Sequence, residues 1–130
     1  MKYLGIDFGT KKIGIALSDE NGEFAFPKMI VKPEEAVAEI AGLCQQESVG
    51  AIVLGRSVAG NGVENDVAVL ADHFREKIEG ATGLLVYLQD EGHSSVEAHR
   101  YQTTAGSRDD SAAAIILQRY LDRVRRDEVQ

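Results

Sequence analysis

The stretch YLGIDFGTKKIGIALSD, residues 3–19, constrains the fold more strongly than any other part of the sequence. Residues 3–8 and 12–18 are rich in Ile, Leu, Tyr and Phe, and the short glycine-containing segment between them predicts two strands in an antiparallel hairpin. Asp7 interrupts the first apolar run. Because an unpaired carboxylate is costly to bury, an acid at this position is expected to face a metal ion, a hydrogen-bond donor or a phosphate group.

The rest of the chain predicts one more strand of this meander and then alternating helices and strands. Pro27 lies in the third strand and predicts that this strand forms a sheet edge. The two later strands are short apolar runs, expected to be covered on both faces, and each follows a crossover helix that makes it parallel to its neighbour. After the hairpin, the expected elements are a strand at 23–31, a helix at 33–46, a strand at 50–55, a helix at 61–79, a strand at 83–89, a short helix at 94–102 and a helix at 109–126.

This order predicts an α/β fold with a five-stranded mixed sheet, three antiparallel strands followed by two parallel ones, flanked by helices. It is the topology of the ribonuclease H-like architecture. With 130 residues, the chain is expected to form a single domain, residues 1–130. The last helix carries apolar residues at helical spacing on one inner face, namely Ala113, Ile116, Leu117, Tyr120, Leu121 and Val124.

Composition narrows the class of protein. The formal net charge of −7 argues against non-specific coating of nucleic acid, where a basic surface dominates affinity, but it leaves room for an enzyme that grips phosphates locally. No segment approaches the ~20 apolar residues of a membrane span, and the N-terminal segment lacks a secretory signal pattern, so a cytoplasmic protein with no membrane partner is expected. Cys44 lies at an apolar helix position and is expected to be a buried thiol.

Acidic residues stand out by their positions in the predicted elements. Asp7 lies inside the first strand, and Asp90 and Glu91 directly follow the last strand. Asp109 and Asp110 open the last helix. Because open α/β sheets place their sites at the carboxyl ends of parallel strands, these acids can converge there. Converging carboxylates suit Mg²⁺ or Mn²⁺, and a pair of such ions activates water and stabilises the leaving oxygen in phosphodiester hydrolysis.

Each of these acids also has a structural interpretation, which the sequence leaves open. Asp7 can hydrogen-bond the turn that follows it, and Glu91 can be a solvated loop residue. Asp109 or Asp110 can cap the last helix. The basic residues nearest the expected cleft are Lys11, Lys12, Arg56, Arg100 and Arg108. They are candidate phosphate contacts, although exposed Lys and Arg side chains commonly serve only to keep a surface soluble.

Three segments in the correct order carry a family resemblance: GIDFGTKKIGIALSD (5–19), DEGHSSVEA (90–98) and RDDSAAAIILQRYLD (108–122). They resemble the signature motifs of the YqgF family, the RuvX-type group of bacterial ribonuclease H-like nucleases, described both as candidate Holliday junction resolvases and as pre-16S rRNA nucleases. The resemblance implies that Asp7, Glu91 and Asp110 are the catalytic, metal-binding carboxylates. Asp110 is preferred to Asp109 because the family's acid directly precedes the small-residue stretch of the last helix.

The resemblance further implies a divalent-metal nuclease that takes part in the 5′ maturation of 16S rRNA. The chain departs from the family pattern at Gly92, where members commonly have Arg, and at Gly55-Arg56-Ser57, where they usually have Gly-Leu-Pro. These departures bear on substrate binding more than on metal binding. The leading hypothesis is a pre-rRNA nuclease, and the alternatives are a Holliday junction resolvase-like DNA endonuclease and a catalytically weakened nucleic-acid-binding module. Whether the chain forms a homodimer stays open.

Overall fold

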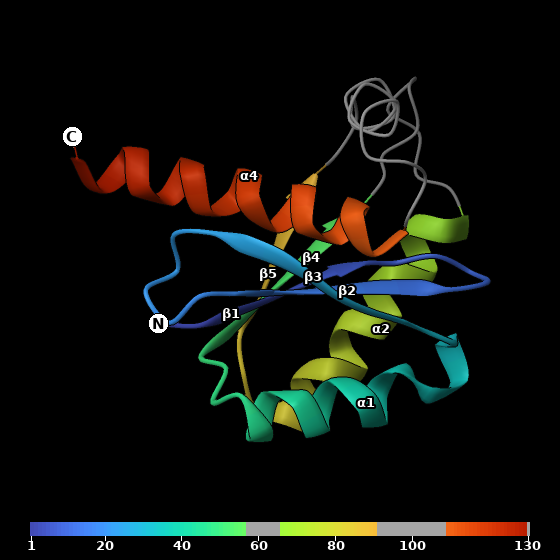
Figure 1. The fold of residues 1–130 in the computed structure, drawn as a ribbon. Helices are drawn as coiled ribbons and strands as arrows, with labels where there is room; N and C mark the ends of the chain where they lie inside the picture. The colour runs from blue at the N-terminus through green and yellow to red at the C-terminus, as the bar shows by residue number, and fades with distance from the viewer. Residues whose placement is uncertain (57–65, 91–108, 130) are drawn as a thin grey trace.

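The computed structural model describes residues 1–56, 66–90 and 109–129, which form one mixed β-sheet with helices packed on it (Figure 1). The strands are β1 (Tyr3–Asp7), β2 (Ile13–Ser18), β3 (Ala25–Val31), β4 (Ala51–Arg56) and β5 (Val86–Asp90). The helices are α1 (Pro33–Gln46), α2 (Asp66–Thr82) and α4 (Asp109–Val129). None of these described helices combines the length and the apolar character that a membrane crossing requires.

The sheet has the strand order β3-β2-β1-β4-β5, so the first strand of the chain lies at its centre. β2 pairs antiparallel with both β1 and β3, whereas β4 runs parallel to both β1 and β5. The predicted mixed sheet of three antiparallel strands followed by two parallel ones is therefore confirmed. Pro27 lies in β3 at one edge of the sheet, where its missing N–H leaves no gap in the interior of the ladder.

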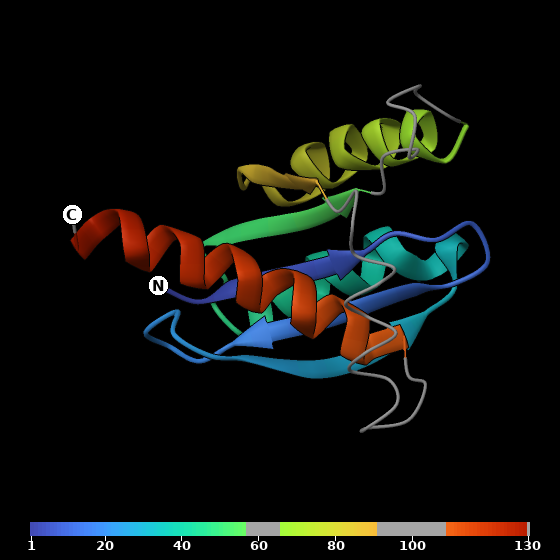
Figure 2. The same ribbon diagram turned by 90° about the horizontal axis from the view of Figure 1, so that it is seen from above.

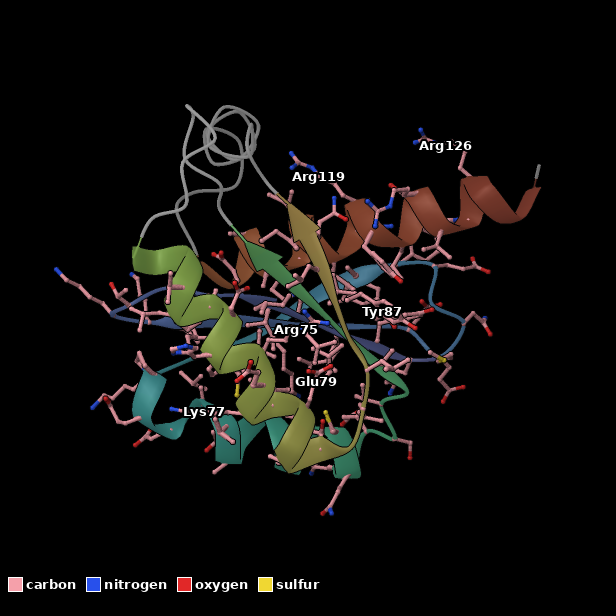
Figure 3. The ribbon with its side chains drawn as sticks, turned by 180° about the vertical axis from the view of Figure 1, so that it is seen from behind. Arg75, Lys77, Glu79, Tyr87, Arg119 and Arg126 are labelled. Carbon is pink, nitrogen blue, oxygen red and sulfur yellow. The ribbon has the colours of Figure 1, made fainter. Side chains whose placement is uncertain are left out.

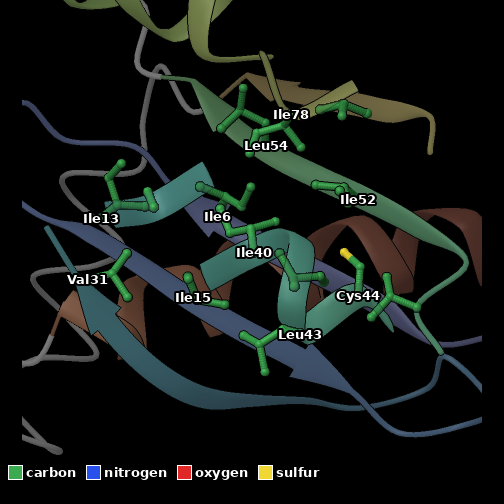
Figure 4. Packing of buried hydrophobic residues seen from close by; sticks show 14 of the residues in the cluster. Ile6, Ile13, Ile15, Val31, Ile40, Leu43, Cys44, Ile52, Leu54 and Ile78 are labelled. Atoms are coloured by element: carbon green, nitrogen blue, oxygen red, sulfur yellow. The ribbon is translucent and has the colours of Figure 1, made fainter. Parts of the chain in front are cut away.

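Helices α1 and α2 cover one face of the sheet, and large aliphatic side chains fill the space between them (Figures 1 and 4). Leu4 and Ile6 of β1 enter this core, together with Ile40 of α1 and Ile78 of α2. Each such fully buried Leu or Ile contributes about 1.5–3 kcal/mol relative to an exposed one. Cys44 is buried in the same core, as predicted, and burial raises the pKa of its thiol to about 11.

Helix α4 covers the opposite face (Figures 1 and 2). Its predicted inner face is confirmed, since Ala113, Ile116, Leu117, Tyr120 and Leu121 are buried and Val124 is partly buried. The helix lies very close to the central strand, because a Cβ added to Gly5 would lie 2.7 Å from the Leu117 Cβ. Glycine at this position of β1 therefore allows the helix and the sheet to pack at short range.

Strand β5 differs from the prediction for residues 83–89. Val86 is buried, but Leu85 and Tyr87 are 62% and 38% exposed. The expectation of a strand covered on both faces is therefore wrong, because β5 lies at the second edge of the sheet and its Tyr87 side is only partly covered. An apolar run predicts a strand, but it does not reveal the place of that strand in the sheet. The predicted short helix at 94–102 and the first five residues of the predicted helix at 61–79 lie outside the described residues.

Candidate active site at the carboxyl end of the central strand

Asp7 is the last residue of β1, and its position in the strand assigns it to the α4 side of the sheet. Successive strand residues point to opposite faces. Leu4 and Ile6 belong to the core under α1 and α2, whereas Tyr3 packs against the cluster under α4. Asp7 follows the alternation of Tyr3 and Gly5 and is half-buried. The acid is therefore not a member of the large aliphatic core, and it faces the side where α4 crosses.

The neighbours of Asp7 in the sheet are both glycines. Asp7 is paired with Gly14 of β2 on one side and with Gly55 of β4 on the other. Gly55 is in turn paired with Gln89 of β5. Directly paired residues share a face of the sheet, so in this row Asp7 and Gln89 carry side chains and the two glycines do not. The Oε1 atom of Gln89 is buried and has no hydrogen-bond partner.

The direction of α4 brings its first turn to the same end of the sheet. The rings of Tyr3 and Tyr120 lie 5.9 Å apart, and Gly5 lies against Ala113 and Leu117. Moving along β1 toward its carboxyl end thus corresponds to moving along α4 toward its first residue, as Figure 2 shows. Asp110 is the second residue of that helix. The backbone of Asp110 therefore lies toward the end of the sheet that carries Asp7.

For the other predicted acids, the structure describes the backbone alone or does not describe the residue. Asp90 ends β5, and in the register of the sheet it is paired with Arg56 at the end of β4. Glu91 and Arg108 lie outside the described residues, as does Arg100. Within the described part of the chain, no three His, Cys, Asp or Glu side chains form a group that could hold a metal ion. Because the predicted set includes Glu91 and the side chain of Asp110, which are not among the residues so described, this set stays a prediction.

Gln89 is a candidate site residue that the sequence interpretation did not identify. Its signal is a polar residue at the end of an apolar strand, immediately before the predicted acids Asp90 and Glu91. The signal becomes specific only with the sheet register, which places Gln89 in the same row as Asp7. Carboxylate and amide oxygens are hard donors of the kind that Mg²⁺ and Mn²⁺ prefer. The Asp7 carboxylate therefore has the donor chemistry of a divalent-metal site.

Comparison with known proteins identifies the family. A family model described as "RuvX: Holliday junction resolvase" matches residues 1–123. The chain belongs to the RuvX family. A Bordetella petrii protein named "Putative pre-16S rRNA nuclease" is 42% identical over 122 residues, which cover 92% of this chain and 93% of that protein. A relative of the same name from Nitratidesulfovibrio vulgaris is 35% identical and covers 94% of each chain. The resemblance to the YqgF family is thus confirmed.

Solved structures share the fold of this RuvX-family chain. RuvC of T. thermophilus in complex with a Holliday junction substrate has a TM-score of 0.61 at 17% identity, covering 93% of each chain. The fowlpox virus Holliday junction resolvase has a TM-score of 0.56 at 13% identity, covering 94% of this chain and 99% of that one. At these identities the likeness is one of fold, and it confirms the predicted ribonuclease H-like class.

Proposed function

We propose that this chain is a nuclease that hydrolyses phosphodiester bonds of RNA in the 5′ maturation of pre-16S rRNA. The observation that carries the proposal is the place of Asp7: it lies at the carboxyl end of the central strand, on the α4 side, with glycines on both neighbouring strands. Relatives that carry the name of a pre-16S rRNA nuclease match more than nine-tenths of this chain, which supports the choice of substrate.

The proposed catalytic and metal-binding residues are Asp7, Glu91 and Asp110. Two Mg²⁺ or Mn²⁺ ions held by these carboxylates would activate a water molecule and stabilise the leaving oxygen of the phosphodiester. Asp7 supplies a carboxylate from a fixed strand end, where Gly14 and Gly55 add no side chain from the neighbouring strands and Ile116 of α4 packs against Gly55. Gln89 supplies an unpartnered amide oxygen to the same row.

Basic residues around this edge are proposed to bind the substrate backbone. Lys11 and Lys12 are exposed in the segment between β1 and β2, directly after Asp7 and Phe8. With Arg56 and Arg108 they form the proposed set of phosphate contacts, which position the strand without reading its sequence. We further propose that residues 1–130 act as one nuclease domain in the cytoplasm.

A cleavage assay with Asp7→Asn tests the proposal. The substitution keeps the size of the side chain and removes its charge, so the fold is expected to survive while cleavage of a pre-16S transcript with Mg²⁺ or Mn²⁺ falls at least about 100-fold, the scale seen when one transition-state-stabilising group is lost. Asp122→Asn makes the same chemical change on the exposed surface of α4 and is expected to cleave like the wild type. Equal activity of the wild type and Asp7→Asn contradicts the proposal.

A four-way DNA junction in the same assay tests the second candidate, which the description of the family model as a Holliday junction resolvase motivates. Junction cleavage that exceeds RNA cleavage would favour a DNA endonuclease. Binding of metal and nucleic acid without cleavage of either substrate would favour a catalytically weakened module, in keeping with Gly92 at the position where the family commonly has Arg.

A further inference from the structure

One flank of α4 is bonded to the connection between β2 and β3. On the flank toward β3, Gln118 bonds to the β2–β3 connection, donating from Nε2 to the carbonyl of Glu23 at 2.9 Å. Arg125 donates to the same carbonyl at 3.2 Å and to the Asp122 carboxylate at 3.0 Å. This flank is therefore tied down within the protein, and its acid and its base neutralise each other.

The opposite flank, toward β4 and β5, carries three arginines. Arg119, Arg123 and Arg126 follow one another at spacings of four and three residues, which places them along one side of the helix. Arg123 and Arg126 are exposed and Arg119 is half-buried. Figure 3 shows Arg119 and Arg126 projecting from α4 away from the sheet. We call these three residues the arginine flank; they extend over about 10 Å of helix.

An exposed aromatic ring accompanies the arginine flank. Tyr87 of β5 stacks on Tyr120 with the ring centroids 5.7 Å apart and 23° between the ring planes. The guanidinium of Arg123 lies 5.3 Å from the centroid of the same Tyr120 ring. Tyr120 is buried, but Tyr87 keeps 38% of its surface exposed on the edge strand. Arg123 and the accessible Tyr87 thus contact the same ring, that of Tyr120, beside the edge strand β5.

Arg119, Arg123 and Arg126 gather three positive charges on one helix of a chain that has 14 Lys and Arg against 21 Asp and Glu. Asp122, the acid between Arg119 and Arg123 in sequence, points instead to the other flank, where it accepts from Arg125 and Gln118. The Arg123 guanidinium beside a stacked ring, with Arg119 and Arg126 along the same helix, matches the phosphates and bases of a nucleic-acid strand.

We propose that the arginine flank and Tyr87 bind a single-stranded segment of the RNA substrate as it leaves the candidate active site. The proposal rests on the proposed nuclease function, which supplies the RNA. α4 begins at the edge that carries Asp7, so the arginine flank leads away from that edge along the helix. The guanidinium groups contact phosphates, and Tyr87 stacks on an unpaired base, which a duplex does not offer.

The test compares two charge-matched triple variants in the Asp7→Asn background, which prevents cleavage. The first, Arg119→Gln/Arg123→Gln/Arg126→Gln, removes the arginine flank. The second, Lys28→Gln/Lys32→Gln/Arg125→Gln, removes the same three charges from the β3 side of the molecule. Binding of a fluorescent single-stranded RNA from the pre-16S 5′ leader is measured by anisotropy over a range of salt concentrations, and thermal melts confirm that every variant is folded.

The first variant is expected to bind at least about tenfold more weakly. Because each contact to a single strand contributes about 0.7 to the slope of log affinity against log salt, that slope is expected to fall by about 2. The second variant is expected to keep both its slope and its affinity to within about threefold, since Lys28 and Lys32 lie in and directly after β3 and Arg125 is already bonded to Glu23 and Asp122 on the β3 flank. Tyr87→Ala is expected to weaken binding about fivefold or more, and Tyr87→Phe to restore it.

Equal losses in the two triple variants, an unchanged salt slope in the first, or tighter binding of duplex DNA than of the RNA would each overturn this inference. If cleavage by the wild type persists while the arginine-flank variant binds like its control, only this inference fails. If the wild type neither binds nor cleaves the RNA, the proposed function fails as well, so the two failures are distinguishable.

Discussion

The two faces of the sheet divide stability and chemistry between them. On the α1/α2 face, β1 and β4 present large aliphatic side chains such as Leu4, Ile6 and Ile52, which form the main core. On the α4 face, the same strands present Gly5 and Gly55, so that the helix lies against the sheet backbone. The α4 face ends in the polar row that contains Asp7. Because successive side chains of β1 point to opposite faces, the same strand contributes to the core and carries the candidate catalytic acid. Substitutions on the two faces should therefore affect stability and cleavage separately.

The largest stability effect is expected on the α1/α2 face. Ile52 is fully buried near the start of β4, so Ile52→Ala is expected to cost about 2–5 kcal/mol of the free energy of unfolding, measured in urea. Its cleavage rate is expected to match that of the wild type at a temperature at which both proteins are folded, because the residue faces away from Asp7. A loss of cleavage in the folded variant would break the proposed division between the faces.

A smaller stability effect, coupled to activity, is expected on the α4 face. A Cβ at position 55 would lie 2.5 Å from the Ile116 Cδ1, so Gly55→Ala must displace that side chain or the helix. Overpacking of this kind costs about 1–3 kcal/mol. Because the first turn of α4 moves with the helix, cleavage is also expected to fall. Adding Ile116→Val is expected to restore part of the lost stability and part of the lost cleavage rate. A double-mutant cycle measures this coupling.

Gly80→Ala serves as the control for this substitution. A Cβ at Gly80 would meet no heavy atom within 4 Å, and the residue lies in α2. Alanine there is expected to stabilise the fold by about 0.4–1 kcal/mol and to leave cleavage unchanged. If Gly55→Ala and Gly80→Ala behave alike, the close approach of α4 does not matter to the site.

The smallest effect is expected at the end of the sheet opposite to Asp7. Lys2 and Glu47 form an ion pair at 3.0 Å that links the start of the chain to the end of α1, and it holds the pKa of the Glu47 carboxyl below its ordinary value of 4.5. A carboxyl group whose pKa is lower in the folded state than in the unfolded state stabilises the fold at a pH above its unfolded-state pKa. This contribution is lost as the pH falls through the folded-state pKa. Thermal melts should therefore show a slightly smaller acid-induced loss in Glu47→Gln than in the wild type. A larger loss in the variant would contradict this.

Much of the fold follows from local patterns in the sequence. The inner face of α4 was predictable residue by residue, because its apolar positions repeat at helical spacing and nothing interrupts them. The parallel direction of β4 and β5 was predictable from the crossover helices before them. The exposure of Leu85 and Tyr87 was not predictable, because it depends on β5 being an edge and on how far α4 reaches, and both are properties of the assembled sheet.

The candidate site was predictable to a lesser extent. Asp7 stood out because an acid in an apolar strand needs a reason, and the structure brings the first turn of α4 toward the same edge. Gln89 needed the register that pairs it with Gly55. The difference between the two flanks of α4 also lies beyond sequence patterns, because helical spacing groups residues without revealing which strand each group faces.

The central claim is that Asp7 is a metal ligand, and calorimetric titration of Mn²⁺ tests it most directly. Wild type, Asp7→Asn and the surface control Asp122→Asn are titrated under identical conditions, without nucleic acid. The account predicts that Asp7→Asn weakens Mn²⁺ binding at least about tenfold, the loss that substitution of an outer-shell partner of a metal ligand already causes, while Asp122→Asn binds like the wild type. Equal Mn²⁺ affinity of the wild type and Asp7→Asn would contradict it.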